Sequence, residues 1–578
     1  MNTVTKLLTD HIDVWTAADT EKKSGRGRSA ADSGSVYGIK KLRELILDLA
    51  VRGKLVPQDS NDEPSNQLLK RIEIDRAFLR KNGSIKPEKP YPRIDTKEAP
   101  FPVPDGWTWV NLAQIGHDWG QTTPEGQFTY IEVSAIDSNL GIVSSPELVE
   151  ANDAPSRARK IVRSGTVIYS TVRPYLRNIA VIEDDFSPSP IASTAFAVIH
   201  PFCEMPPRYI LAYLRSPPFV RYVESVQTGI AYPAINDKQF FSGLFPLPPL
   251  AEQHRIVAKV DELMALCDQL EAGHAGAAEA HENLVTQLLG TLTASENAED
   301  FAANWQRIAT HFDTLFSTEV SIDALKQTIR ELAIMGKLVP QDPNDEPAIE
   351  LLNRIKNQKA RLIREKIIRG GKPLEPIEIS DWKHAIPSGW QVVRFGEIGD
   401  WGAGATPSRS VASYYGGDIK WFKSGELSND FIDTSEETIT ERALKECSLR
   451  LNKIGDVLIA MYGATIGKAS ILNSVGTTNQ AVCACSPFDG IDNRYLLLVL
   501  KAMRANFIGQ GAGGAQPNIS REKIIATAFA VCPTAEQHRI VAKVDQLMSM
   551  CDQLKTRLSE ANRVQQTLAD AIVTQAVA

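Results

Sequence analysis

Basic residues interleaved with tyrosines gather in one stretch of the first half of the chain. Residues 155–182 contain six arginines or lysines and no aspartate or glutamate. Arginine can pair with phosphate oxygens, or bind guanine through two hydrogen bonds in the major groove of DNA. Two interpretations stay open for this stretch: a DNA contact, or a merely solvated face. The basic residues are Arg157, Arg159, Lys160, Arg163, Arg173 and Arg177, and the tyrosines are Tyr169 and Tyr175.

Further candidates for DNA contact come from matching positions in the two halves of the chain. Gln516 and Asn518 are included because a side-chain amide matches the hydrogen-bonding edge of adenine. The alternative for residues 517–519 is a loop that only caps a helix. The remaining candidates are Tyr232 and Lys238 in the first half, and Lys420, Lys423, Tyr462, Lys468 and Arg521 in the second.

A second basic stretch lies in the middle of the chain. Residues 353–372 contain eight arginines or lysines, and Glu365 is the one acidic residue among them. Such a segment meets DNA phosphates, meets an acidic protein partner, or is simply a solvated helix. The sequence leaves these three alternatives open.

Two short motifs imitate the active site of an adenine methyltransferase. The tetrapeptide Ser-Pro-Pro-Phe at 216–219 fits the motif that grips a flipped adenine. The pattern Phe-x-Gly-x-Gly at 507–511 fits a loop that binds S-adenosylmethionine. A working enzyme needs both motifs in one domain, each at the end of a parallel strand. Here they lie in different halves of the chain, and Ser216 follows an expected helix, so we predict that neither is catalytic.

The rest of the sequence also lacks a pattern for catalysis or metal binding. The seven cysteines are scattered, and Cys483 and Cys485 alone cannot form a zinc site. There is no phosphate-binding G-x-x-x-x-G-K-[ST] loop, and no nucleophile-and-base arrangement stands out among the nine histidines. We therefore predict no catalytic residue, no metal and no cofactor bound by this chain.

The sequence contains two copies of the segments that are expected to position the basic residues. The segment at 53–64 returns almost unchanged at 336–347, and the segment at 251–270 returns at 535–554. Internal repetition of this kind sets the architecture and has to be recognised first. Two fainter matches lie between them: residues 104–107 with 387–390, and residues 232–235 with 516–519.

The repeated segments have the apolar spacing of packed helices. In the 251–270 segment the apolar positions are spaced 4, 3, 4 and 3, which is the a/d seam of helix-on-helix packing. Gly53 and Gly336 are the expected helix stops of the other repeated segment. The seam residues are Leu42, Leu45, Leu49, Ile256, Val260, Leu263, Cys267 and Leu270, with copies at Leu325, Ile329, Leu332, Ile540, Val544, Leu547, Cys551, Leu554 and Leu558.

The two blocks between the repeated helices diverge. They carry short β-rich runs punctuated by glycine and proline, so we expect mixed α/β domains of about 145 residues each. Conserved helices serve one repeated partner or each other, whereas diverged blocks serve two different targets. The expected organisation is a flexible segment at 1–38, helical regions at 39–103, 249–386 and 533–578, and α/β blocks at 104–248 and 387–532.

These duplicated motifs resemble those of the specificity subunits of Type I restriction–modification enzymes. The resemblance rests on Glu-Gln-His-Arg-Ile-Val at 252–257 and 536–541, and on Gly-Lys-Leu-Val-Pro-Gln at 53–58 and 336–341. It implies an α/β fold with two target-recognition domains separated by long antiparallel coiled-coil helices, related by a pseudo-twofold repeat. A helix of about 40 residues is roughly 60 Å long, a spacer comparable with about 15 base pairs of DNA.

The resemblance also implies a function in bacterial defence against phage DNA. The chain would read an asymmetric, bipartite DNA site and dock two modification subunits together with restriction subunits. S-adenosylmethionine would belong to the modification subunits, which methylate adenine N6, and ATP with Mg²⁺ to the restriction subunits. The alternatives are a self-contained adenine methyltransferase built on the two short motifs, and a protein scaffold that binds no DNA.

The composition fits a cytoplasmic protein. No apolar run approaches the roughly 20 residues that span a bilayer, and residues 1–30 lack the pattern of a secretion signal. Scattered cysteines favour a reducing compartment. The net charge of −7 argues mildly against nucleic acid, but a basic face can coexist with an acidic remainder.

Overall fold

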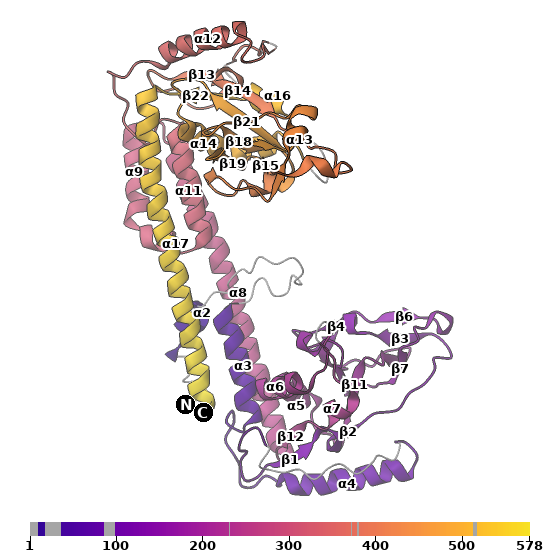
Figure 1. Cartoon of the computed structure of the whole chain (residues 1–578). Helices are drawn as coiled ribbons and strands as arrows, with labels where there is room; N and C mark the ends of the chain where they lie inside the picture. The colour runs from indigo at the N-terminus through magenta and orange to yellow at the C-terminus, as the bar shows by residue number, and fades with distance from the viewer. Residues whose placement is uncertain are drawn as a thin grey trace. The chain divides into compact units, whose positions relative to one another are not determined.

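The computed structural model describes residues 10–17, 36–85, 99–229, 232–371, 373–378, 381–511 and 517–578. These residues form two compact units, one from Met1–Ala278 with Glu560–Ala578 and one from Glu279–Ser559. Each unit contains a helical bundle and an α/β domain (Figure 1). Mixed α/β domains, long helices and an internal repeat are all present, so the predicted fold class is confirmed.

Three helices form the bundle of the first unit. They are α3 (Tyr37–Val51), the first part of α8 (Leu250–Ala294) and the end of α17 (Thr534–Val577). Arg43 on α3 pairs with Asp268 and Glu271 on α8, both at 2.8 Å. The apolar seam explains the packing, because its residues on α3 and α8 lie in one core with Ala569 and Ile572 of α17.

Part of the predicted flexible segment 1–38 is a packed helix. Helix α2 (Ile12–Ala17) buries Val14 and Trp15, and the Trp15 side chain is fully buried. Apolar side chains of this size stabilise a short helix against α3, so this stretch is ordered rather than flexible. Most of the remainder of that segment lies outside the described residues.

The α/β domain of the first unit is built on two sheets and one strand pair. The sheets have strand orders β2-β11-β8-β9-β5-β4 and β6-β3-β10-β7, and β1 pairs antiparallel with β12. Helices α4 (Ser65–Lys81), α5 (Pro207–Arg215), α6 (Pro217–Val226) and α7 (Asp237–Phe241) pack around them. The strands are β1 (Thr108–Asn111), β2 (Gly116–His117), β3 (Phe128–Ile131), β4 (Ile136–Asp137), β5 (Ile142–Val143), β6 (Glu147–Val149), β7 (Ala158–Ile161), β8 (Val167–Ser170), β9 (Ile179–Val181), β10 (Pro190–Ser193), β11 (Phe196–Pro201) and β12 (Leu244–Leu247).

The bundle of the second unit repeats that of the first. Helix α11 (Glu319–Ile334) packs on the first part of α17 and on the end of α8, with α9 (Ala298–Thr310) and α10 (Phe312–Leu315) beside them. Lys555 on α17 pairs with Asp323 on α11 at 2.7 Å, and Lys326 pairs with Asp552. All the predicted seam residues of this half are buried or partly buried in the same core.

The second α/β domain repeats the strand pair and much of the sheet topology of the first. Strand β13 pairs with β22, and the sheets have orders β14-β21-β18-β19-β16 and β17-β15-β20. The strands are β13 (Gln391–Arg394), β14 (Gly399–Ala403), β15 (Tyr415–Phe422), β16 (Phe431–Ile432), β17 (Glu437–Ile439), β18 (Val457–Ala460), β19 (Ala469–Leu472), β20 (Gly476–Thr478), β21 (Val482–Pro487) and β22 (Ala528–Val531). The helices are α12 (Ala348–Arg364), α13 (Glu441–Glu446), α14 (Asn493–Ala502), α15 (Arg504–Gly509) and α16 (Arg521–Ala526). Within the described ranges, no helix is long and apolar enough to cross a membrane.

Candidate nucleic-acid interface

A buried carboxylate joins the first α/β domain to its bundle. Glu252, near the start of α8, is 1% exposed. One of its carboxylate oxygens accepts a hydrogen bond from the Trp107 indole at 2.9 Å, and the other accepts one from the Gln58 amide at 2.6 Å. Burial raises the pKa of Glu252. We call this group, with the bidentate Arg255–Asp62 pair at 2.6 and 3.1 Å beside it, the first junction.

The second unit contains the same junction. Glu536, also 1% exposed, accepts hydrogen bonds from the Trp390 indole at 2.9 Å and from the Gln341 amide at 3.2 Å. Burial raises the pKa of Glu536 as well. Arg539 pairs with Asp345 at 2.6 and 3.1 Å. Every member of this second junction is the repeat counterpart of a member of the first.

Both residues of the repeated Gly-Lys pair also have a structural role in each unit. Gly53 and Gly336 have φ of 68° and 70°, and a Cβ atom at either position would lie 2.5 Å from a proline Cγ. The Lys54 ammonium donates to the Val577 carbonyl at the end of α17, at 3.0 Å. Its counterpart Lys337 donates to two carbonyls at the end of α8, both at 2.8 Å. Each lysine therefore neutralises the negative end of a long helix.

These junction residues were absent from the sequence-based list of site residues. Their identity in the two copies is the signal, but spacing along the chain gives no sign that residues 145 and 194 positions before Glu252 donate to its buried carboxylate. The residues are Gln58, Asp62, Trp107, Glu252 and Arg255, with counterparts Gln341, Asp345, Trp390, Glu536 and Arg539.

Each α/β domain carries a pair of loops joined in an identical way. In the first, the Arg173 amide donates to the Pro233 carbonyl at 2.9 Å, and the Ile235 amide donates to the Thr171 carbonyl at 3.0 Å. In the second, the Gly463 amide donates to the Pro517 carbonyl at 2.8 Å and the Ile519 amide to the Met461 carbonyl at 2.9 Å. The fainter sequence match at 232–235 and 516–519 therefore marks one conserved backbone arrangement, which we call the paired loops.

The side chains on the paired loops differ between the two domains. Arg173 in the first has φ of 50°, where the second has Gly463 at 58°. Its guanidinium lies over the Tyr232 ring, 5.3 Å from the centroid, and Tyr232 is 70% exposed. Arg177 also has positive φ, at 53°, where the second domain has Gly467. A residue with a Cβ in this conformation costs about 1 kcal/mol or more relative to glycine.

The other residues of the first domain that are predicted to contact DNA differ in solvent exposure. Arg157, Lys238 and Tyr175 are exposed, Arg159 is half-buried on β7, and Arg163 stacks on the Trp119 ring at 3.9 Å. Lys160 is 6% exposed and lies 3.5 Å from Asp237. Tyr169 is buried against Phe219 and Phe240. The prediction is corrected at Lys160, because its position within a sheet buries the side chain, and the interleaved Tyr169 is buried in the same way.

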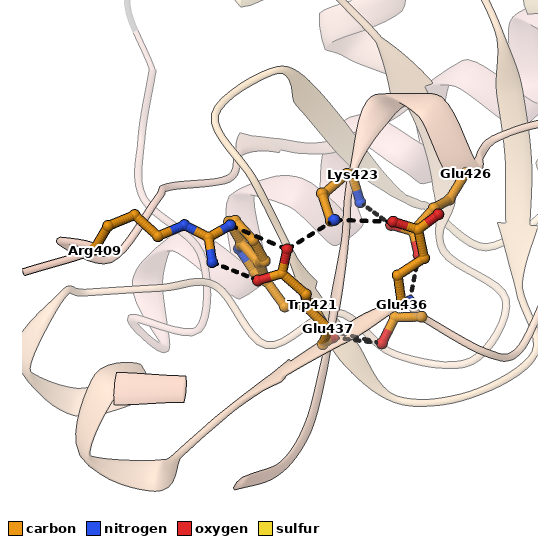
Figure 2. Close-up of polar contacts among 7 residues, drawn as sticks. Arg409, Trp421, Lys423, Glu426, Glu436 and Glu437 are labelled. Carbon is orange, nitrogen blue, oxygen red and sulfur yellow. Dashed lines mark hydrogen bonds and ion pairs between the residues drawn. The ribbon is translucent and has the colours of Figure 1, made fainter. Parts of the chain in front are cut away.

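In the second domain, some of the basic residues predicted to contact DNA form ion pairs with carboxylates of the protein itself. Lys423 pairs with Glu436 at 3.0 Å and Glu437 at 2.8 Å, while Glu437 also binds Arg409 (Figure 2). The Arg409 hydrogen bonds, reinforced by Lys423, lower the pKa of Glu437 to about 2. Lys423 is therefore held in an ion-pair network rather than presented as a free cation.

The remaining predicted DNA-contact residues of the second domain differ in exposure and in the contacts that they make. Tyr462 and Asn518 are exposed and form a β-bridge on the paired loops. Lys468 is half-buried, and Lys420 donates to the Asp433 carbonyl. Arg521 pairs with its neighbour Glu522 at 3.0 Å. Gln516 lies outside the described residues.

Residues 353–364 of the basic stretch belong to α12, and a turn follows the helix. Lys359 donates to the Gly396 carbonyl at 2.9 Å, which fixes α12 to its domain as Arg76 on α4 is fixed to Ala113 and Gln114. In the part of the chain that the structure describes, Lys356, Arg361 and Arg364 make no ion pair. Their role stays a prediction, with the same alternatives as before.

The two methyltransferase-like motifs occupy the wrong structural positions for catalysis. Ser216 is fully buried, its hydroxyl donates to the Tyr213 carbonyl at 2.7 Å, and the tetrapeptide begins α6 between two helices. Phe507 is buried within α15. Neither motif follows a strand. Within the described residues, no group of three or more potential ligands could hold a metal ion.

The comparisons with known proteins agree on one family. The model of the Type I restriction modification DNA specificity domain matches residues 387–563. Two Escherichia coli proteins, the specificity subunits of the Type I restriction enzymes EcoAI and EcoEI, are 37% and 36% identical to this chain. Each match covers 99% of this chain and all of the relative.

A solved structure from a study of complex assembly and conformational transition in the type I R-M system is also similar. It is 25% identical with a TM-score of 0.50, and the match covers 83% of this chain and 99% of the other. A structure from a type I R-M system is therefore similar in fold to most of this chain. The chain belongs to the family of Type I restriction enzyme specificity subunits.

Replacing Trp107 by phenylalanine should lower the free energy of unfolding by about 1–3 kcal/mol, because the buried Glu252 carboxylate loses a donor. Denaturant unfolding measures the change. The matched control is Trp305→Phe on α9, where the indole is 40% exposed. A loss at Trp107 no larger than at Trp305 would contradict the role of the first junction.

The ion pairs of Glu437 should make the second domain sensitive to acid. A carboxylate with a lowered pKa contributes stability above its ordinary pKa, and this stability disappears as the pH falls from about 4.5 towards 2. Thermal midpoints measured between pH 6 and pH 2.5 should fall more steeply for the wild type than for Glu437→Gln. Glu441→Gln, at an exposed ion pair, is the control and should follow the wild type. Parallel curves for Glu437→Gln and wild type would show that the ion pairs contribute nothing.

Proposed function

We propose that this chain reads an asymmetric, bipartite DNA site, one half with each α/β domain, for a Type I restriction–modification complex. The paired loops carry this proposal. They have the same backbone hydrogen bonds in both domains but present different side chains, as expected of two readers with different targets. The exposed Arg173, Tyr175 and Tyr232 supply cationic and aromatic groups suited to DNA.

The chain itself contributes recognition and assembly, and catalysis belongs to its partners. We assign S-adenosylmethionine and methylation of adenine N6 to two modification subunits, and ATP with Mg²⁺ to restriction subunits. The misplaced methyltransferase-like motifs support a non-catalytic role for the specificity subunit. Double-stranded DNA and these subunits are its proposed partners, in the cytoplasm.

Exposed apolar side chains on the long helices support docking of a partner. Val564 and Leu568 lie one turn apart on α17 and are 64% and 43% exposed. Exposed apolar groups at this spacing are typical of a face that another helix covers.

Mapping of N6-methyladenine by long-read sequencing tests the proposed function directly. In a host that carries active modification subunits, a split, asymmetric motif should lose methylation when this gene is deleted. Complementation with the intact gene should restore it. Unchanged methylation in such a host would reject the DNA-reading role.

Lysines at Val564 and Leu568 should prevent assembly with the modification subunit, because two charges would have to be buried at the interface. Co-purification should fall at least tenfold while the thermal midpoint of the specificity subunit changes little. Ile454→Lys, at a 65% exposed position in the second α/β domain, should co-purify like the wild type. Normal assembly of the double variant would place the docking face elsewhere.

A further inference from the structure

Arg173 occupies a backbone conformation that the second repeat gives to glycine. The two backbone hydrogen bonds that join the paired loops are the same in both repeats, and Arg173 at φ 50° corresponds to Gly463 at φ 58°. Side chains with a Cβ rarely adopt this region, whereas glycine adopts it freely. Retention of arginine at this position therefore calls for a specific use of its guanidinium.

Within the described ranges, the Arg173 guanidinium contacts one aromatic ring and has no polar partner. Among the described residues, the Arg173 side chain forms no hydrogen bond or ion pair, and the residue is exposed. The Arg173 guanidinium lies over the Tyr232 ring on the other of the paired loops, 5.3 Å from the ring centroid. Arg177 differs, because its guanidinium lies 3.9 Å from Glu44 on α3. The Arg173 side chain is thus oriented by an aromatic face and left open to an external ligand.

A base edge explains this arrangement better than a phosphate does. Phosphates accept a cation from many positions, and the first domain already exposes Arg157 and Arg163 at unstrained ones. A base edge instead requires a planar donor at one exact place, and arginine binds N7 and O6 of guanine with two parallel hydrogen bonds. Stacking on Tyr232 limits the orientations of the guanidinium before DNA arrives.

We infer that Arg173 reads a guanine in the half-site bound by the first α/β domain. Gly463 gives the second domain no guanidinium at the equivalent place, so the two half-sites differ at this point of the paired loops. This inference rests on the proposed function and adds to it a specificity-determining residue and the chemical group that it recognises.

The test uses the full chain assembled with its modification subunit. Methylation mapping of the wild type first supplies the motif, and DNA duplexes with each G·C pair of the first half-site replaced are then compared for binding. The wild type should discriminate against one replacement by about tenfold or more. Arg173→Gly and Arg173→Lys should both discriminate by less than about twofold at that pair, and all other pairs should be read as before.

The thermal midpoint of Arg173→Gly provides a second readout. A structural role for Arg173 would lower it, whereas a recognition role predicts a rise. Arg173→Gly should raise the thermal midpoint by about 2 °C, because it removes an unfavourable backbone conformation. The matched control is Ser448→Gly, since Ser448 has φ of 50° after α13 and lies outside the paired loops and both basic stretches. This control should gain similar stability and keep the wild-type DNA motif.

Three results would overturn the inference. Full discrimination by Arg173→Lys would indicate a phosphate contact, and full discrimination by Arg173→Gly would remove the residue from recognition. A lower thermal midpoint for Arg173→Gly would make it a structural residue. A wild-type complex with no sequence-specific motif would instead reject the proposed function itself, which separates the two failures.

Discussion

The structure depends on two carboxylates that are buried where the α/β domains meet the helices. A buried carboxylate is tolerated only when donors satisfy it. Glu252 and Glu536 each obtain an indole donor from the start of the α/β domain and an amide donor from the loop after the first helix of the repeat. Three segments far apart in the chain must therefore come together at once. Near-identity of the two sets of motifs follows from this requirement, since a change in any one segment leaves the carboxylate unsatisfied.

The paired loops show the opposite behaviour on an equally conserved backbone. Their hydrogen bonds join main-chain atoms, so the side chains are free to change without loss of the loop geometry. Arginine and tyrosine in one domain correspond to glycine and other residues in the second. Under the proposed function, domain attachment and DNA recognition depend on different atoms, so a new DNA target would require no change at the junctions. The ion-pair network around Glu437 belongs to the second domain's own divergence from the first.

The sequence predicts the repeat, the seam and the two α/β blocks because each depends on local spacing. Leu263 and Leu547, for example, lie at positions where a helical period places apolar residues on one face. The sequence does not predict sheet order, because strand pairing joins distant segments. Burial of Lys160 follows from the place of β7 beside β10, and pairing of Lys423 follows from the return of the chain at Glu436 and Glu437. Local spacing in the sequence reveals neither the burial of Lys160 nor the ion-pair partners of Lys423. Composition alone therefore overestimated the number of exposed, unpaired basic residues.

The completion of the first unit by residues 560–578 has a consequence for synthesis on the ribosome. Helix α3 is made early, but Asp570, which Tyr37 and Lys41 bind, is made more than 500 residues later. At the usual rates of bacterial translation this delay is roughly tens of seconds or longer. During that time part of the apolar face of α3 and α8 has no covering helix, whereas the contiguous second unit needs no such wait. The first bundle of the nascent chain therefore stays incomplete until residues 560–578 are made, whereas the second is complete earlier.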